Sequence, residues 1–320
     1  MRFAVQVLLL VCGIAAVVQA QPYPAKPVRM IVGFTPGGAT DIISRILGQQ
    51  LTESFGKPVV IENRPGASGM IGAELVARAQ PDGYTLYMAS QTTHAVAPYM
   101  YAKAPYDPVR DFAAVCLVVN NPLLLVTHPS LRIATVKDLV ALAKSRPGQL
   151  SFATGGVGAS GHMSAELFKS MVKIDMLAVH YKGDSAALTD VLGGQVPLMF
   201  VNISAVLQHV RAGKLRGLAV TGGKRSTIAP DFPTVAESGF PGYEVVTWFG
   251  VLAPAATSKE VIGRLNAETI RALQLPSVRE QIGKQGFEIV GSSPEDFAVF
   301  LKEENVRWAR VVKESGARAE

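Results

Sequence analysis

The chain has 320 residues, of which 48% are hydrophobic and 18% charged, and its formal net charge at pH 7 is +6. The basic residues are dispersed and form no run, which argues against a nucleic-acid-binding surface. A chain of this length can bury a large core, and it indicates either two domains or one large one.

The first twenty residues have the pattern of a secretory signal peptide. Arg2 precedes a mainly apolar run over residues 3–18, and Val18-Gln19-Ala20 ends in the small-x-small pattern of a cleavage site. The alternative is an uncleaved N-terminal anchor. Cleavage after residue 20 removes Cys12 and leaves Cys116 as the last cysteine, so we expect a mature chain with no internal disulfide. Because cleavage also removes the apolar run, we expect the mature chain to have no membrane span. The expected location is the periplasm.

Apolar runs typical of strands alternate with helical patterns along the rest of the chain. This alternation predicts an α/β fold with mostly parallel sheets covered by helices. The predicted strands are Val28–Val32, Val59–Ile61, Thr85–Ala89, Val115–Val119, Leu123–Val126, Ser151–Ala153, Leu198–Val201, Leu215–Val220 and Val245–Leu252. The predicted helices include Asp41–Phe55, Gly72–Ala79, Val136–Ser145, His162–Met171, Ser185–Leu192 and Ala205–Ala212.

Two long apolar runs bear on the domain organisation. They cover Asn120–Val126 and Tyr243–Leu252, and no low-complexity linker divides the chain. We therefore expect two domains joined by strands that cross between them. Three helix starts fit a capping box, at Thr135, Thr257 and Ser293.

The first glycine-rich loop reads Gly33-Phe34-Thr35-Pro36-Gly37-Gly38-Ala39-Thr40-Asp41. It follows a predicted strand and opens a predicted helix, so backbone N–H groups and the helix dipole favour an anion there. The loop holds no Lys, Arg or His. This composition suits a small carboxylate that is held by backbone and hydroxyl groups and is later released.

A second loop repeats this design at residues 151–161, between a predicted strand and the helix that carries Met163 and Phe168. Residues 156–161 formally match G-x-G-x-x-G, but no acidic residue sits cleanly at the next strand end, which disfavours dinucleotide binding. A tight turn without a ligand is the plainer alternative. Two such loops favour two facing anion sites.

The sequence offers few patterns typical of catalytic or metal-binding sites. The five histidines show no metal-ligand spacing, and His162 and Glu166, one turn apart, are typical of an ordinary surface pair. No G-x-S-x-G elbow exists. The sequence therefore predicts no metal, no cofactor and no enzyme activity. The alternative is an exported serine hydrolase that uses Ser160 and a histidine assembled by the fold.

An ordered series of motifs resembles the Bug-type (TctC-like) solute receptors of tripartite tricarboxylate transporters. The resemblance covers essentially the whole mature chain. The first loop is followed by Glu62-Asn63-Arg64-Pro65-Gly66-Ala67-Ser68-Gly69, Pro81-Asp82-Gly83-Tyr84-Thr85-Leu86, Tyr181-Lys182-Gly183, Gly193-Gly194-Gln195-Val196, Ala212-Gly213-Lys214-Leu215-Arg216, Pro233-Thr234-Val235-Ala236-Glu237-Ser238-Gly239 and Trp248-Phe249-Gly250.

The resemblance implies a type II periplasmic-binding-protein-like fold whose two α/β lobes close over one small carboxylate. It implies residues 21–122 plus 246–320 for lobe 1 and residues 123–245 for lobe 2. The implied ligands are di- or tricarboxylates, aromatic acids or acidic amino acids. The implied ligand-binding residues are Phe34, Thr35, Pro36, Gly38, Ala39, Thr40, Asp41, Ser90, Gln91, Thr92, Thr154, Gly158, Ala159, Ser160, Tyr181, Lys182, Asp184 and Asn202.

Asp41 is expected to fix the start of its helix and the loop backbone, because a carboxylate is a poor direct ligand for an anion. Three residues depart from the family pattern: His180, Asp184 and Val201. All three fall in the second lobe, so we expect its distal pocket to have a specificity of its own. Asp184 would favour a ligand with an ammonium or hydroxyl group at its far end.

The sequence thus predicts a monomeric extracytoplasmic receptor. It binds a small carboxylate and delivers it to the membrane permease subunits of a tripartite tricarboxylate-type transporter. One alternative keeps the receptor and has it report ligand binding to a signalling partner. Another is the hydrolase.

Overall fold

The computed structural model describes residues 23–318, so the predicted signal peptide lies outside the described residues. The strands are β1 (Val28–Val32), β2 (Val59–Asn63), β3 (Thr85–Ser90), β4 (Phe112–Thr127), β5 (Ser151–Thr154), β6 (Leu177–His180), β7 (Leu198–Asn202), β8 (Arg216–Val220), β9 (Val246–Pro254) and β10 (Glu288–Ile289). The helices are α2 (Ala39–Phe55), α3 (Met70–Ala77), α4 (Ala97–Met100), α5 (Val136–Ser145), α6 (Ser160–Val172), α7 (Asp184–Leu192), α8 (Ile203–Arg211), α9 (Lys259–Gln274), α10 (Pro276–Lys284) and α11 (Pro294–Ser315). Short helical turns η1 (Ala67–Gly69), η2 (Thr92–Val96) and η3 (Pro129–Leu131) complete the set.

The first lobe is built on a sheet with the strand order β2-β1-β3-β9-β4. β1 runs parallel to β2 and β3, and β9 runs antiparallel to β3 and β4. Alternate residues of β1 face opposite sides, as strand geometry requires. Met30 packs with Leu47 of α2 and Leu265 of α9 on one face, whereas Ile31 packs with Ala73 of α3 on the other.

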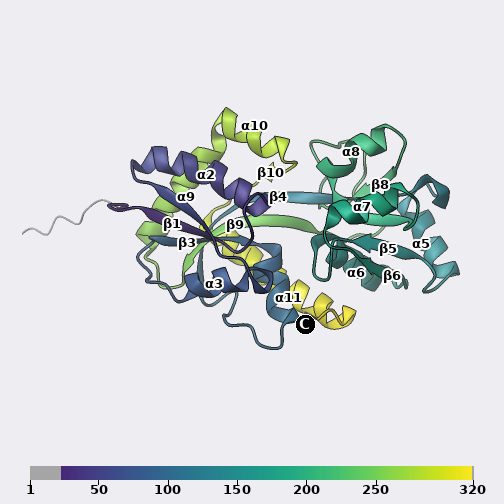
Figure 1. Ribbon diagram of the computed structural model, residues 1–320, viewed down its shortest axis with the longest axis horizontal. Coiled ribbons are helices and arrows are strands. Elements are labelled where there is room, and N and C mark those ends of the chain that lie inside the picture. Colours follow the sequence, from purple (N-terminus) through teal and green to yellow (C-terminus); the bar gives the residue numbers. More distant parts are fainter. Residues whose placement is uncertain (1–22, 319–320) are drawn as a thin grey trace, which may run out of the picture.

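The second lobe continues the sheet as β4-β7-β5-β6, with β8 also paired to β4. β5 is parallel to β6 and β7, whereas β4 is antiparallel to β7 and β8. Phe152 and Phe168 belong to the core on the α6 side, and Ala187 of α7 and Val206 of α8 belong to the opposite core. The fold is thus the predicted two-lobed α/β arrangement (Figure 1), but the expectation of mostly parallel sheets is wrong, because β4 and β9 pair antiparallel with their neighbours in both lobes' sheets.

One strand, β4, belongs to both lobes. Its pairing changes from β9 at Pro122 to β7 at Leu123, and Pro122 pairs with Val246 of β9. The prediction of two separate strands at Val115–Val119 and Leu123–Val126 is therefore wrong: they form one strand that runs through a proline. The residue boundaries of the lobes stay a prediction.

Local details differ from the sequence-based expectations. Helix α9 is capped by Ser258, whose hydroxyl accepts from the Val261 N–H, so the capping box predicted at Thr257 is wrong by one residue. Thr135 forms the predicted box with Asp138. β6 and β10 are short strands that the apolar pattern did not predict. Within the described residues, no helix is long and apolar enough to cross a membrane.

Candidate functional site

Parallel strands of both lobes end at loops that lead into helices, and such loops form the ligand crevice of open α/β sheets. In the first lobe β1 and β3 continue into the loop before α2 and into η2. In the second lobe β5, β6 and β7 continue into the starts of α6, α7 and α8. The start of α2 lies on the side of the first lobe that faces the second (Figure 1).

The loop before α2 leaves its helix start open. Gly38 is the N-cap residue and has no side chain to accept from the first-turn N–H groups, which also lack intrahelical acceptors. Thr35 and Ala39 are exposed, whereas Thr40 is buried. Gly33 must be a glycine because a Cβ there would overlap the Tyr87 hydroxyl. The positive end of the α2 dipole therefore meets solvent without a capping side chain.

Asp41 clamps this loop, as the sequence predicted. Its Oδ2 accepts the Gly37 N–H and the Arg45 Nε–H at 2.9 Å each, and its Oδ1 accepts from Arg45 Nη2 and Asn63 Nδ2, also at 2.9 Å. Asn63 Nδ2 also donates to the Phe34 carbonyl at 2.9 Å. Burial opposes ionisation of Asp41, but the hydrogen bonds from Arg45, Gly37 and Asn63 outweigh it and lower the pKa to about 2.

The polar residues after β3 are mostly engaged within the protein. Ser90 and Thr93 are buried and hydrogen-bonded to each other, and the Thr93 hydroxyl also lies 2.9 Å from His94 Nδ1. Thr92 is half-buried. Gln91 is 1% exposed, and within residues 23–318 its Nε2 has no hydrogen-bond partner. Among the predicted ligand-binding residues in this segment, Gln91 therefore has a buried donor whose hydrogen bond is left to a ligand or to water.

The second-lobe loop, residues 155–159, also leads into an uncapped helix. Its N-cap residue, Ala159, offers no side-chain acceptor to the start of α6. Thr154 Oγ1 accepts the Gly156 N–H at 3.4 Å and donates to the Gly156 carbonyl at 3.2 Å. Gly158 is left-handed, with φ +75°, and Ser160 is half-buried at the first helical position. The two loops thus share one design.

The segment from Tyr181 to Asp184 packs against this loop. The Gly183 N–H donates to the Gly155 carbonyl at 2.9 Å, and a Cβ at Gly155 would overlap the Asp184 carboxylate. The Tyr181 hydroxyl donates to Asp190 at 2.7 Å. Lys182 is exposed. Lys182 therefore presents a cation here, while the Tyr181 hydroxyl is already engaged.

Asn202 ends β7 and pairs with Leu123 of β4, the strand that both lobes share. Its Oδ1 accepts from the Ser204 N–H at 3.3 Å, so it caps α8. The Ser204 hydroxyl lies 3.5 Å from the Gln285 carbonyl in the first lobe. Asn202 is therefore placed between the lobes with its oxygen used locally. Val201, before it, is buried in the core of the second lobe.

The two lobes touch at Gly158. A Cβ added to Gly158 would lie 2.6 Å from the Met100 sulfur and 3.8 Å from Val96 Cγ1. The Tyr101 hydroxyl lies 3.3 Å from Ser68 Oγ, which is in the turn after β2. Met100 therefore links the second-lobe loop to the first lobe.

Sequence reasoning assigned no role to several residues that shape these loops. Asn63 bridges Phe34 and Asp41, and its position directly at a strand end was the available signal. Ala67 and Ser68 have left-handed backbones, with φ of 47° and 55°, which nothing in their residue types indicated.

His162 and Glu166 are not the surface pair that the sequence predicted. Their side chains are only 6% and 10% exposed, with His162 Nε2 and Glu166 Oε1 3.8 Å apart. Glu166 pairs instead with Lys169 at 2.8 Å. Among the hydrogen bonds of the described residues, none joins the Ser160 hydroxyl to a histidine.

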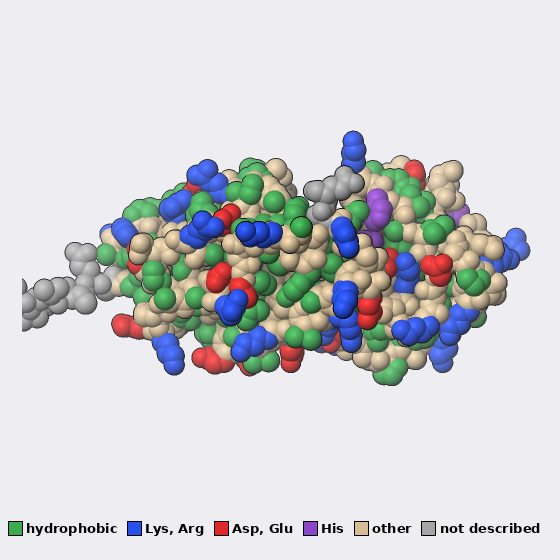
Figure 2. All heavy atoms as spheres, turned by 90° about the horizontal axis from the view of Figure 1, so that it is seen from below, with side chains coloured by type: hydrophobic (Ala, Val, Ile, Leu, Met, Phe, Trp, Pro, Cys, Tyr) green, Lys and Arg blue, Asp and Glu red, His purple; other side chains and the backbone are tan. Residues whose placement is uncertain are grey.

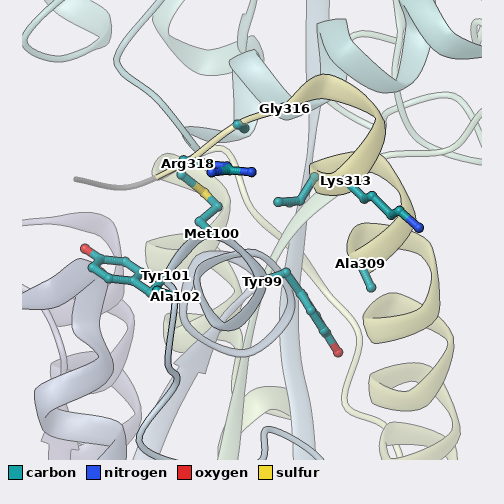
Figure 3. Close-up of a pocket in the computed structure, with 10 residues that line it drawn as sticks. Tyr99, Met100, Tyr101, Ala102, Ala309, Lys313, Gly316 and Arg318 are labelled. Carbon is teal, nitrogen blue, oxygen red and sulfur yellow. The ribbon is translucent and has the colours of Figure 1, made fainter.

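A cavity of about 620 Å³ lies between residues 99–102 and the C-terminal part of α11 (Figure 3). Met100 and Arg318 both line it. None of the predicted ligand-binding residues lines this cavity. It is therefore not the predicted site, although Met100 borders both.

Charge is distributed without a single-sign tract on the face shown in Figure 2, where basic and acidic side chains are interspersed along both lobes. Within residues 23–318, no group of three or more His, Cys, Asp or Glu side chains is placed to hold a metal ion. The groups available for binding are thus backbone N–H groups, amides, hydroxyls and Lys182.

Two α/β lobes that share a strand, each with an uncapped helix start directly after a strand, form a fold typical of solute-binding receptors. The chain matches the family model for the tripartite tricarboxylate transporter family receptor over residues 43–317, and it belongs to that family. It is 41% identical over 307 residues to Protein BugT of Bordetella pertussis, covering 96% of this chain and 94% of that protein. The resemblance to Bug-type receptors is thereby confirmed.

Solved structures agree with this assignment. R. palustris Rpa4515 with adipate is 38% identical, with a TM-score of 0.76, over 92% of this chain and 99% of that one. MatC from Rhodopseudomonas palustris with bound malate is 31% identical, with a TM-score of 0.73, over 91% of this chain and 100% of that one. Both are therefore relatives whose solved structures contain a small dicarboxylate.

Proposed function

We propose that the chain is an extracytoplasmic receptor that binds a small carboxylate between its lobes and delivers it to the membrane subunits of a tripartite tricarboxylate-type transporter. The observation that carries the proposal is the uncapped start of α2 behind a loop clamped by Asp41. The relatives whose solved structures contain adipate and malate support the ligand class. Family membership supports a periplasmic location and the transporter partner.

The proposed binding involves no covalent step. Free N–H groups at the start of α2 replace water around one carboxylate, and the helix dipole favours its charge. Asp41 is fully engaged with Gly37, Arg45 and Asn63, so it orders the donors and does not repel the ligand as a free carboxylate would. The clamp also means that the donors are in place before the ligand arrives, which lowers the entropy cost of binding.

The second lobe supplies the opposite wall. The start of α6 is also uncapped, and Lys182 adds a cation at the neighbouring turn. Closure about β4, the strand that the lobes share, and about the segment that enters β9 at Val246 then buries the ligand, and only contacts made in the closed state favour that state. The proposed ligand contacts are those implied by the family resemblance. Asp41, Ser90 and Tyr181 are the exceptions, because they contribute by holding neighbouring groups in place.

A thermal-shift screen of residues 21–320 tests the proposal. The panel consists of adipate, malate, succinate, citrate, glutamate, aspartate, nicotinate, benzoate and terephthalate. A ligand at 100 times its dissociation constant stabilises the protein by about 2.7 kcal/mol, which raises the melting temperature of a chain of this length by about 4 °C. A folded, ligand-free protein that responds to no carboxylate in the panel contradicts the proposal.

A further inference from the structure

His162 lies behind the second-lobe loop, at the third position of α6, and is 5% exposed. Its Nδ1 accepts the Gly158 N–H at 3.1 Å. Gly158 precedes the N-cap residue, so the imidazole reaches back over the helix start as a capping side chain does. Nδ1 can accept an N–H only when the imidazole is neutral and carries its proton on Nε2.

The surroundings keep this ring neutral. Burial lowers the pKa of His162 to about 4, and the positive charges of Lys169 and of a protonated His180 oppose its protonation further. The groups that face the ring are Phe152, stacked at 6.3 Å between centroids, His180, edge-on at 4.8 Å, and Glu166, whose carboxylate is neutralised by Lys169. The Nδ1 acceptor is therefore present throughout the range from pH 5 to 8.

The bond to His162 fixes the part of the loop that meets the first lobe. Gly158 is left-handed and lies against Met100, so small changes in its backbone alter the contact between the lobes. The other end of the loop is tied by Thr154 to Gly156. Val157, between the two ties, is 48% exposed. Without the acceptor at position 162, the side-chain ties from Thr154 to Gly156 and from Asp184 to Gly155 would hold only the other end of the loop.

We propose that His162 is a positioning residue that holds the loop of residues 155–159 in its ligand-binding shape by accepting the Gly158 N–H. The proposal rests on the proposed receptor function, and His162 acts through Gly158 without touching the ligand. What matters is an acceptor at this position, not the charge or the aromatic ring. Two variants separate these properties.

His162→Asn places Oδ1 close to the position of Nδ1 and keeps an acceptor, whereas His162→Leu keeps bulk and removes it. Amide hydrogen exchange of Gly158, followed by NMR in the ligand-free protein, reports the bond directly. The expected result is protected exchange in wild type and His162→Asn and fast exchange in His162→Leu. In wild type the Gly158 amide signal shifts as the pH falls through about 4, where the protonated ring loses its acceptor, and in His162→Asn it does not.

Adipate affinity supplies the functional readout. His162→Leu is expected to weaken adipate binding about tenfold and His162→Asn by less than about threefold, from the value of one neutral hydrogen bond. Unchanged exchange of Gly158 in His162→Leu, or equal affinity losses in both variants, overturns the proposal. Absence of adipate binding in wild type counts against adipate as the ligand under the proposed function, while the Gly158 exchange still decides the role of His162.

Discussion

The open start of α2 makes a sharp prediction for Gly38→Asp. Gly38 has φ −76° and ψ 166°, a conformation that any residue adopts, and a Cβ there would come no closer than 3.7 Å to the Thr35 carbonyl. An aspartate at this N-cap position accepts from the N–H groups two and three residues on. Its carboxylate therefore occupies the donors that we assign to the ligand.

The substitution Gly38→Asp should raise the stability of the unliganded protein and weaken ligand binding. Asp in place of Gly at an N-cap adds a few tenths of a kcal/mol, and its charge at the helix start adds about 0.3–1 kcal/mol. The unliganded variant should thus melt about 1 °C above wild type. Ligand at 100 times the wild-type dissociation constant should then add almost none of the 2.7 kcal/mol that wild type gains.

Thermal shift with adipate and malate measures both effects. Gly38→Ala is the matched control, because it adds a Cβ without an acceptor and should keep the ligand response. Gly38→Asp with a wild-type ligand response would refute the assignment of the α2 start as the carboxylate site. Equal loss in both variants would show that the Cβ, and not the competing carboxylate, blocks binding.

Three further predictions concern stability. Asp41→Asn should lower the free energy of unfolding by about 1–2 kcal/mol at pH 7, a value reduced for solvent screening because Arg45 is half-exposed. Because the pKa of Asp41 is depressed in the folded state, the stability difference between wild type and variant persists above pH 4 and closes as the pH falls towards 2. Urea unfolding over this pH range measures it. Gly158→Ala should cost about 1–3 kcal/mol for its left-handed backbone, and it should cost less when it is made in a Met100→Ala background, measured in the same assay. Burial raises the pKa of Glu304 despite Arg307 and two indole N–H donors, so wild type should lose stability relative to Glu304→Gln as the pH rises above 4.5. Tryptophan-monitored urea unfolding at pH 4.5 and 8 checks this, and a pH-independent difference would contradict it.

Much of the fold could be predicted because the apolar runs match the sheet. The run Val28–Val32 is β1 to the residue, since a buried parallel strand reads as a nearly continuous apolar segment, interrupted here by the exposed Arg29. β4 was divided because a proline interrupts its pattern, yet Pro122 lies where the strand changes partners and its missing N–H costs little. β6 escaped notice because Leu177 and His180 are exposed, so its pattern is weak.

The site was predictable where local chemistry decides it. The role of Asp41 at the start of α2 followed from the loop sequence, whereas the predicted helix began at Asp41 and α2 begins at Ala39, so Gly38 was not predicted as the N-cap residue. The partners of Ser90, Tyr181 and His162 lie only three, nine and four residues away in the chain, but the residue types do not show that these side chains turn back onto their own turns and helices. The unpartnered Gln91 amide belongs to the same class.

Calorimetric titration of residues 21–320 with the acid that gives the largest thermal shift, and with its primary amide, tests the central claim most directly. We predict saturable binding of the acid and at least tenfold weaker binding of the amide, roughly the difference between charged and neutral hydrogen bonds. Equal affinity for acid and amide would contradict a site built around a carboxylate.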